Sequence, residues 1–125
     1  MLVDDVADYL ASQGFGDVGK VIFKGEYPEK PDKLIWLHHG GGEHPRRAWA
    51  GERPALQIVV RDLTFAGAYA TAYELFNLLH GLTSQTMGTC TYYDIDAMSS
   101  PEQLGVDKNG RTEFVLNFRV LKNVE

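Results

Sequence analysis

Four side chains of types that bind metal ions lie close together in one stretch of the chain. They are His38, His39, Glu43 and His44. Imidazole and carboxylate groups form a metal site only where they converge on one point. His38 and His39 are neighbours, so their side chains point to opposite sides if a strand runs through them. We expect no bound metal or other cofactor; a solvated polar loop and a small metal-binding enzyme both stay open as interpretations.

A patch of arginine and tryptophan overlaps the end of this stretch. It comprises Arg46, Arg47, Trp49 and Arg53. Arginine and tryptophan are enriched at the centres of protein interfaces, and they also suit phosphate contact combined with base stacking. A third interpretation is that Trp49 folds back onto the protein. Because the rest of the chain is acidic, nucleic-acid binding ranks last, and we predict a protein interface.

Two glycine-rich motifs match catalytic signatures but lack their context. Residues 14–20 have the spacing G-x-x-x-x-G-K. A phosphate loop needs a strand before it, a helix after it and Ser or Thr after the lysine, where this chain has Val21. Residues 39–42 match the oxyanion loop of lipases, which works only with a G-x-S-x-G nucleophile motif. We therefore predict a protein that is not an enzyme and has no catalytic residues.

Two carboxylates alternate along a predicted strand over residues 89–98. Asp94 and Asp96 point to one side of that strand, together with the ring of Tyr92. Paired carboxylates can share a proton in a hydrolytic site, but nothing near them in the sequence completes one. We expect a solvated strand face.

Composition limits the class of protein. The chain has 125 residues, 44% of them hydrophobic, and a net charge of −5, which predicts one domain over residues 1–125. The negative charge disfavours tight non-specific binding to nucleic acid. Cys90 is the only cysteine, which fits a reducing compartment. The acidic start and the lack of an apolar run of about 20 residues predict neither a signal peptide nor a membrane segment.

The strongest structural pattern lies in residues 54–82. An aliphatic run at 56–60 predicts a strand, and Asp62 or Thr64 can then cap a helix. Apolar side chains follow at spacings of three and four, which places them on one helical face. They are Phe65, Ala68, Ala72, Leu75, Leu79 and Leu82, with Tyr69, Tyr73 and Phe76 widening the face on one side.

The remaining patterns predict shorter elements. Apolar spacing near the start indicates a short helix that Gly14 ends, and strands are expected at 21–23, 34–37, 89–98 and 112–120. Long irregular segments are expected at 38–53 and 99–109, with a turn at 83–88. This order predicts an α+β fold, with a mostly antiparallel sheet, a long central helix and a short N-terminal helix packed on it.

Six stretches, taken in order, resemble the tail-terminator proteins of long-tailed bacteriophages, a family often labelled minor capsid proteins. They are residues 21–28, 34–42, 53–61, 68–82, 101–111 and 114–120. The resemblance spans nearly the whole chain. It implies a structural protein that packs helices on an antiparallel sheet and carries no known catalytic residues. Another small protein of the head–tail joint is the alternative.

The resemblance also implies partners. The family assembles as a six-fold ring that caps the head-proximal end of the tail tube, stops its growth and joins it to a head-completion or connector protein. DNA passes through without specific binding. The implied location is the head–tail junction of the virion, and the host cytoplasm during assembly.

A ring needs two different contact patches on each copy. We expect these patches in the two long loops. The residues predicted at the interface are Arg46, Arg47, Trp49 and Arg53 in one loop, and Gln103 and Asp107 in the other.

Overall fold

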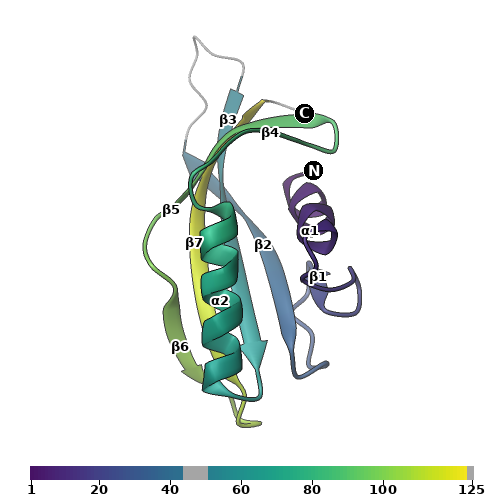
Figure 1. The fold of residues 1–125 in the computed structure, drawn as a ribbon, viewed down its shortest axis with the longest axis vertical. Helices are drawn as coiled ribbons and strands as arrows, with labels where there is room; N and C mark the ends of the chain where they lie inside the picture. Colours follow the sequence, from purple (N-terminus) through teal and green to yellow (C-terminus); the bar gives the residue numbers. More distant parts are fainter. Residues whose placement is uncertain (44–50, 124–125) are drawn as a thin grey trace.

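The computed structural model describes residues 1–43 and 51–123, apart from the side chain of Glu43. These residues form two helices and seven strands (Figure 1). In chain order they are α1 Leu2–Ser12, β1 Ile22–Lys24, β2 Leu34–Glu43, β3 Gly51–Asp62, α2 Phe65–Leu79, β4 Leu82–Met87, β5 Cys90–Ala97, β6 Glu102–Val106 and β7 Thr112–Asn123.

All seven strands belong to one sheet, in the order β1-β2-β3-β7-β5-β4, with β6 also paired to β7. β3 pairs with β7 along almost the whole length of both strands. β5 and β6 therefore share the other edge of β7, and each takes one half of it. Figure 1 shows β6 at one margin of the sheet and β1 at the opposite margin.

The expected fold class is wrong. The sheet is mixed, because β1 runs parallel to β2 whereas the other pairs are antiparallel. The longest elements are β3 and β7, at 12 residues each, and α2, at 15 residues, packs on one face of the sheet they form (Figure 1). The centre of the fold is thus a strand pair and not a long central helix.

Three strand segments were missed because their residues lack the apolar pattern that predicts a strand. Most side chains of β4 and β6 are exposed or half-buried, so these strands lack the apolar alternation that predicts a strand. β2 continues to Glu43 through three glycines, where the sequence indicated an irregular segment. The segments at 83–88 and 99–109 were accordingly read as a turn and a loop.

The core lies between the two helices and one face of the sheet. β3 and β7 send alternate side chains into it, among them Leu56, Ile58, Leu116 and Phe118, all 2% exposed or less. The α2 face buries Ala68, Ala72, Leu75 and Leu79 completely. The predicted helix start is confirmed, because the hydroxyl oxygen of Thr64 accepts a hydrogen bond from the backbone N–H of Gly67 at 3.0 Å.

Tyr92 lies in the core, and not on the face that carries Asp94. A register shift between Tyr92 and Asp94 breaks the expected alternation of β5. The hydroxyl of Tyr92 donates to Oδ2 of buried Asp5 at 2.6 Å. Nζ of Lys122 lies 5.8 Å from the centre of the Tyr92 ring and donates to Oε1 of Glu52 at 2.8 Å. These polar contacts join α1 to the ends of β3, β5 and β7.

β2 bends at a bulge between Gly40 and Glu43. Gly42 and Gly41 give a matched test of this bend. Gly42 has a φ of +68°, and an added Cβ would lie 1.9 Å from the carbonyl oxygen of Arg53, whereas Gly41 has open space. We expect Gly42→Ala to lower the free energy of unfolding by about 2–4 kcal/mol. Gly41→Ala should change it by less than about 0.5 kcal/mol. Denaturant unfolding of both variants measures the difference, and equal effects would contradict the bend.

Candidate subunit interface

Five rings, each in contact with the next, run along one side of α2. This aromatic row comprises Phe65, Tyr69, Tyr73, Phe76 and His80. Consecutive ring centres lie 5.9, 4.7, 6.0 and 5.2 Å apart, which is the range of favourable aromatic contact. The spacing follows from the sequence, because side chains three or four residues apart lie next to each other on a helix.

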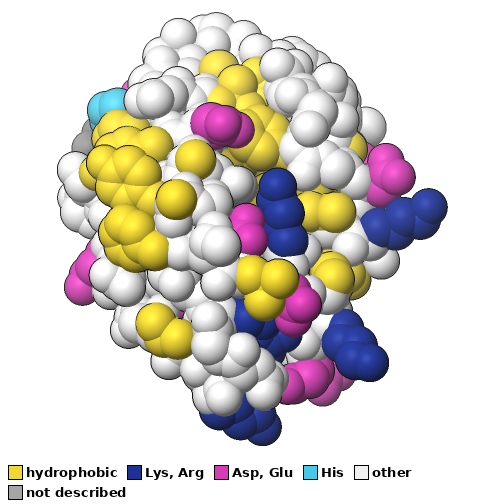
Figure 2. Space-filling model, turned by 60° about the horizontal axis from the view of Figure 1, so that its bottom comes forward, with side chains coloured by type: hydrophobic (Ala, Val, Ile, Leu, Met, Phe, Trp, Pro, Cys, Tyr) yellow, Lys and Arg dark blue, Asp and Glu magenta, His cyan; other side chains and the backbone are white. Residues whose placement is uncertain are grey.

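Both ends of the aromatic row are open to solvent, whereas Tyr73 and Phe76 in its middle are half-buried. Phe65 is 52% and Tyr69 46% exposed. Glu74 is the only charged residue of α2. Figure 2 shows hydrophobic side chains gathered along one margin of the molecule, with a histidine beside them and the Lys and Arg side chains elsewhere on that face. Contiguous apolar surface that stays open in a folded protein marks an interaction site more often than a random feature.

Strand β6 borders the aromatic row. Phe65 and Tyr69 both contact the ring of Phe114 on β7, at 5.6 and 6.0 Å between ring centres. Phe114 pairs across the sheet with Gln103 of β6. Two apolar side chains of β6 are also exposed, Leu104 at 57% and Val106 at 63%. We call the aromatic row and the neighbouring strand β6 together the lateral surface.

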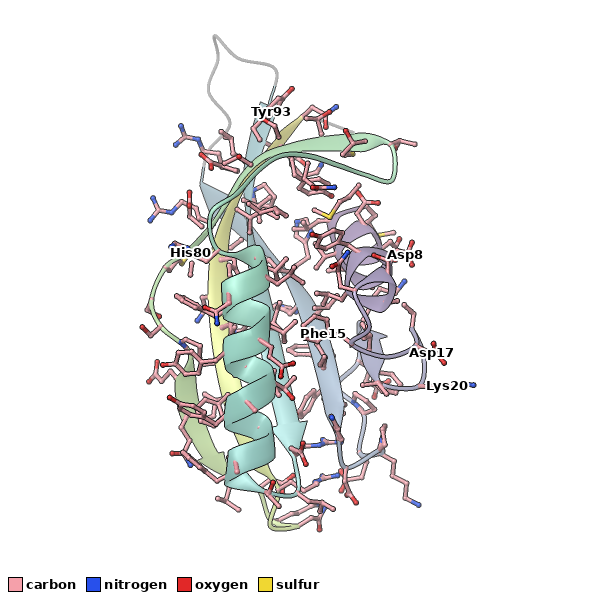
Figure 3. The ribbon with its side chains drawn as sticks, viewed as in Figure 1. Asp8, Phe15, Asp17, Lys20, His80 and Tyr93 are labelled. Atoms are coloured by element: carbon pink, nitrogen blue, oxygen red, sulfur yellow. The ribbon has the colours of Figure 1, made fainter. Side chains whose placement is uncertain are left out.

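His80 ends the row and ties it to the sheet. Its Nδ1 accepts a hydrogen bond from the backbone N–H of Ala97 at 2.9 Å, and its ring stacks on Phe76. Figure 3 shows His80 at the C-terminal end of α2, on the side where β5 passes. The acceptor role at Nδ1 leaves the proton of the neutral ring on Nε2. The row is therefore anchored at its end, and not free to reorient.

Two buried arginines hold the loop between β1 and β2. Arg61 is 1% exposed and donates to the carbonyl oxygens of Pro28, Glu29 and Pro31 at 2.9, 3.1 and 2.6 Å. Arg111 is 4% exposed and donates to the carbonyl oxygen of Glu29 at 2.6 Å. A guanidinium group presents five donors in a fixed plane, which suits several carbonyl groups of one loop.

Asp107 holds the side chain of Arg111 in place. Its Oδ2 accepts from Nε of Arg111 at 2.8 Å, and its Oδ1 accepts from the backbone N–H groups of Arg111 and Asn109, both at 2.9 Å. The backbone hydrogen bond from Arg111, followed by the Arg111 side chain, lowers the pKa of Asp107 below its usual range. The turn that starts β7 is thereby joined to the loop after β1.

A shallow cavity of about 190 Å³ opens near the other end of β7. Arg53, Asp94, Asp96 and Arg119 line it, with Val120 and Leu121. Asp96 lies directly across from Arg119 in the sheet.

A comparison with protein families matches residues 9–124 to the family described as bacteriophage tail terminator protein. The chain belongs to this family. The resemblance inferred from the sequence is confirmed, and the tail terminator is a structural protein of the phage tail. A search of curated proteins finds no match.

The described part of this tail terminator places the predicted interface residues in separate regions. Arg53 is half-buried in β3 beside the cavity, Gln103 is exposed on β6, and Asp107 is bound to Arg111. Arg46, Arg47 and Trp49 lie outside the described residues. The interface role of these six residues stays a prediction. The sequence reasoning missed the aromatic row, because it assigned Tyr69, Tyr73 and Phe76 to the buried stripe.

The candidate metal ligands are placed only in part. His38 and His39 are both exposed, and the ring of His38 stacks on Trp36 with centres 5.1 Å apart. His44 and the side chain of Glu43 lie outside the described residues. Among the residues that are described, no three His, Cys, Asp or Glu side chains are arranged to hold a metal ion. Neither described helix of the tail terminator is long and apolar enough to cross a membrane.

The Asp107 contacts predict how stability depends on pH. A carboxyl with a lowered pKa in the folded state stabilises the protein above its unfolded pKa, and this contribution is lost as the pH falls through the folded value. We expect stability to decline below about pH 4, and Asp107→Asn to make that decline shallower. Urea unfolding between pH 7 and pH 2 measures the slope. Asp17→Asn, at an exposed site, is the control, and an equal change in both variants would contradict the assignment.

Proposed function

We propose that this tail terminator forms a six-membered ring on the head-proximal end of the tail tube. The ring stops tube growth and provides the surface to which a head-completion or connector protein binds. The family match over residues 9–124 is the observation that carries the proposal. The chain acts by shape and subunit contact, first in the host cytoplasm during assembly and then at the head–tail junction of the virion.

The lateral surface supports self-association. Copies with a net charge of −5 repel one another, so contact between them is favoured where acidic groups are sparse. The 20 residues of α2 and β6 contain only Glu74 and Glu102 as charged residues. Burying large aromatic side chains there contributes about 1.5–3 kcal/mol for each ring that becomes fully covered.

The same negative charge supports a channel role. A ring of acidic subunits repels the phosphate backbone of DNA, so DNA passes through without specific binding. The channel is formed by the whole ring, so the residues that line it are contributed by all of the copies.

Electron microscopy of growing tail tubes tests this proposal. Purified tail-tube protein is allowed to polymerise with increasing amounts of the chain. We expect shorter tubes and an extra ring of density at one end only, with the number of capped ends following the amount of chain added. Tubes of unchanged length, with bare ends at a large excess of the chain, would overturn the proposal.

A further inference from the structure

Strand β6 has an open edge. Among the described strands it pairs with β7 alone, through residues Glu102 to Val106. The backbone N–H and C=O groups along its outer side therefore have no strand opposite them in the described fold. Exposed edges are usually blocked by lysine, proline or a bulge. β6 has one bulge, between Gln103 and Gly105, and no lysine.

A second open edge lies at the other end of the sheet. β1 covers only Ile35, Trp36 and Leu37 of β2. At His38, His39, Gly40 and Glu43, β2 pairs only with β3 among the described strands, and a bulge lies between Gly40 and Glu43. This free half of β2 is six residues long, and β6 is five residues long. The two edges are similar in length, differ in sequence, and lie on opposite sides of the β3–β7 pair in the sheet.

We propose that β6 of one copy pairs with the free half of β2 of the next copy, so that the sheet continues across the subunit boundary. This inference rests on the proposed ring. The occupant of the β6 edge is a second copy because the molecule carries both halves of the contact. Joining two different edges is a heterologous contact, which repeats from copy to copy and closes when the rotation allows.

The aromatic row covers this joint. It borders β6 through Phe114, so a strand added at β6 extends the sheet beside Phe65 and Tyr69. Backbone hydrogen bonds give such strand addition its affinity, and side-chain contacts fix the register.

Cysteine cross-linking tests the pairing. The variant Leu104→Cys combined with Gly41→Cys places one thiol on each edge, and a Cβ at Gly41 meets no neighbouring atom. The native Cys90 is 2% exposed. We expect oxidation of the double variant to give a ladder of covalent oligomers on a denaturing gel, and each single variant to stay monomeric. Covalent dimers of Leu104→Cys alone would overturn the proposal, because they would show β6 pairing with β6.

A charge variant supplies an independent readout. Leu104→Lys should weaken self-association at least ~10-fold in sedimentation, because a lysine blocks the edge. Val18→Lys, at a position 38% exposed near β1, is the matched control and should leave association unchanged. If Leu104→Lys still forms rings and the double cysteine variant gives no ladder, edge pairing is wrong and the ring stands. If the unmodified chain forms no oligomer and caps no tube, both proposals fail.

Discussion

Leu79→Asp should abolish folding. Leu79, the last residue of α2, is completely buried, and its replacement loses about 1.5–3 kcal/mol of apolar burial. The new carboxyl must then be charged in the core or take up a proton, which costs several kcal/mol more. The sum approaches the 5–15 kcal/mol that holds a typical domain together. We expect loss of the cooperative thermal transition in circular dichroism and calorimetry.

Asn77→Asp is the matched control for this prediction. It adds the same charge to the same helix, but at an exposed position two residues away. Its melting temperature should stay within a few degrees of that of the unmodified chain. A Leu79→Asp variant that melts cooperatively near the temperature of Asn77→Asp would show that α2 does not pack as described.

Arg61→Ala should have the second largest effect. The buried guanidinium of Arg61 donates to four backbone carbonyls of the loop after β1, and its removal leaves those carbonyls without their donor. Hydrogen bonds from charged donors contribute about 1.5–3 kcal/mol. Because this loop is partly exposed, water replaces some of them, and we expect a loss of roughly 2–4 kcal/mol in the free energy of unfolding.

Arg61→Lys and Lys33→Ala sharpen the measurement. A lysine keeps the charge but lacks the planar set of donors, so Arg61→Lys should recover less than half of the loss. Lys33 is an exposed side chain at the end of the same loop, and Lys33→Ala should be close to neutral. Full recovery by lysine in urea unfolding would show that charge, and not donor geometry, holds the loop.

The sequence predicted the elements whose patterns are local. β3, α2 and β7 carry clear aliphatic runs or periodicity, and the start of α2 at Thr64 follows from its capping side chain. β4 and β6 were not predicted, because their side chains are mostly exposed and give no apolar alternation. The parallel pairing of β1 with β2 was not predicted either, since the sequence of a three-residue strand does not indicate which strand it pairs with or in which direction.

The surface proved harder to predict than the core. A helical stripe indicates which side of α2 is apolar, but not how much of that side the sheet covers, and Tyr69 therefore lies exposed. The role of Arg61 was missed, because its acceptors lie about 30 residues earlier in the chain. The bulge that turns Tyr92 into the core likewise depends on the register of β7, which no local pattern encodes.

Native mass spectrometry of the intact chain, over a range of concentrations, tests the central claim most directly. The account predicts a single closed species at six times the 14.0 kDa mass of one chain, in equilibrium with the monomer. A chain that stays monomeric at every concentration, or that forms only symmetric dimers, would contradict it.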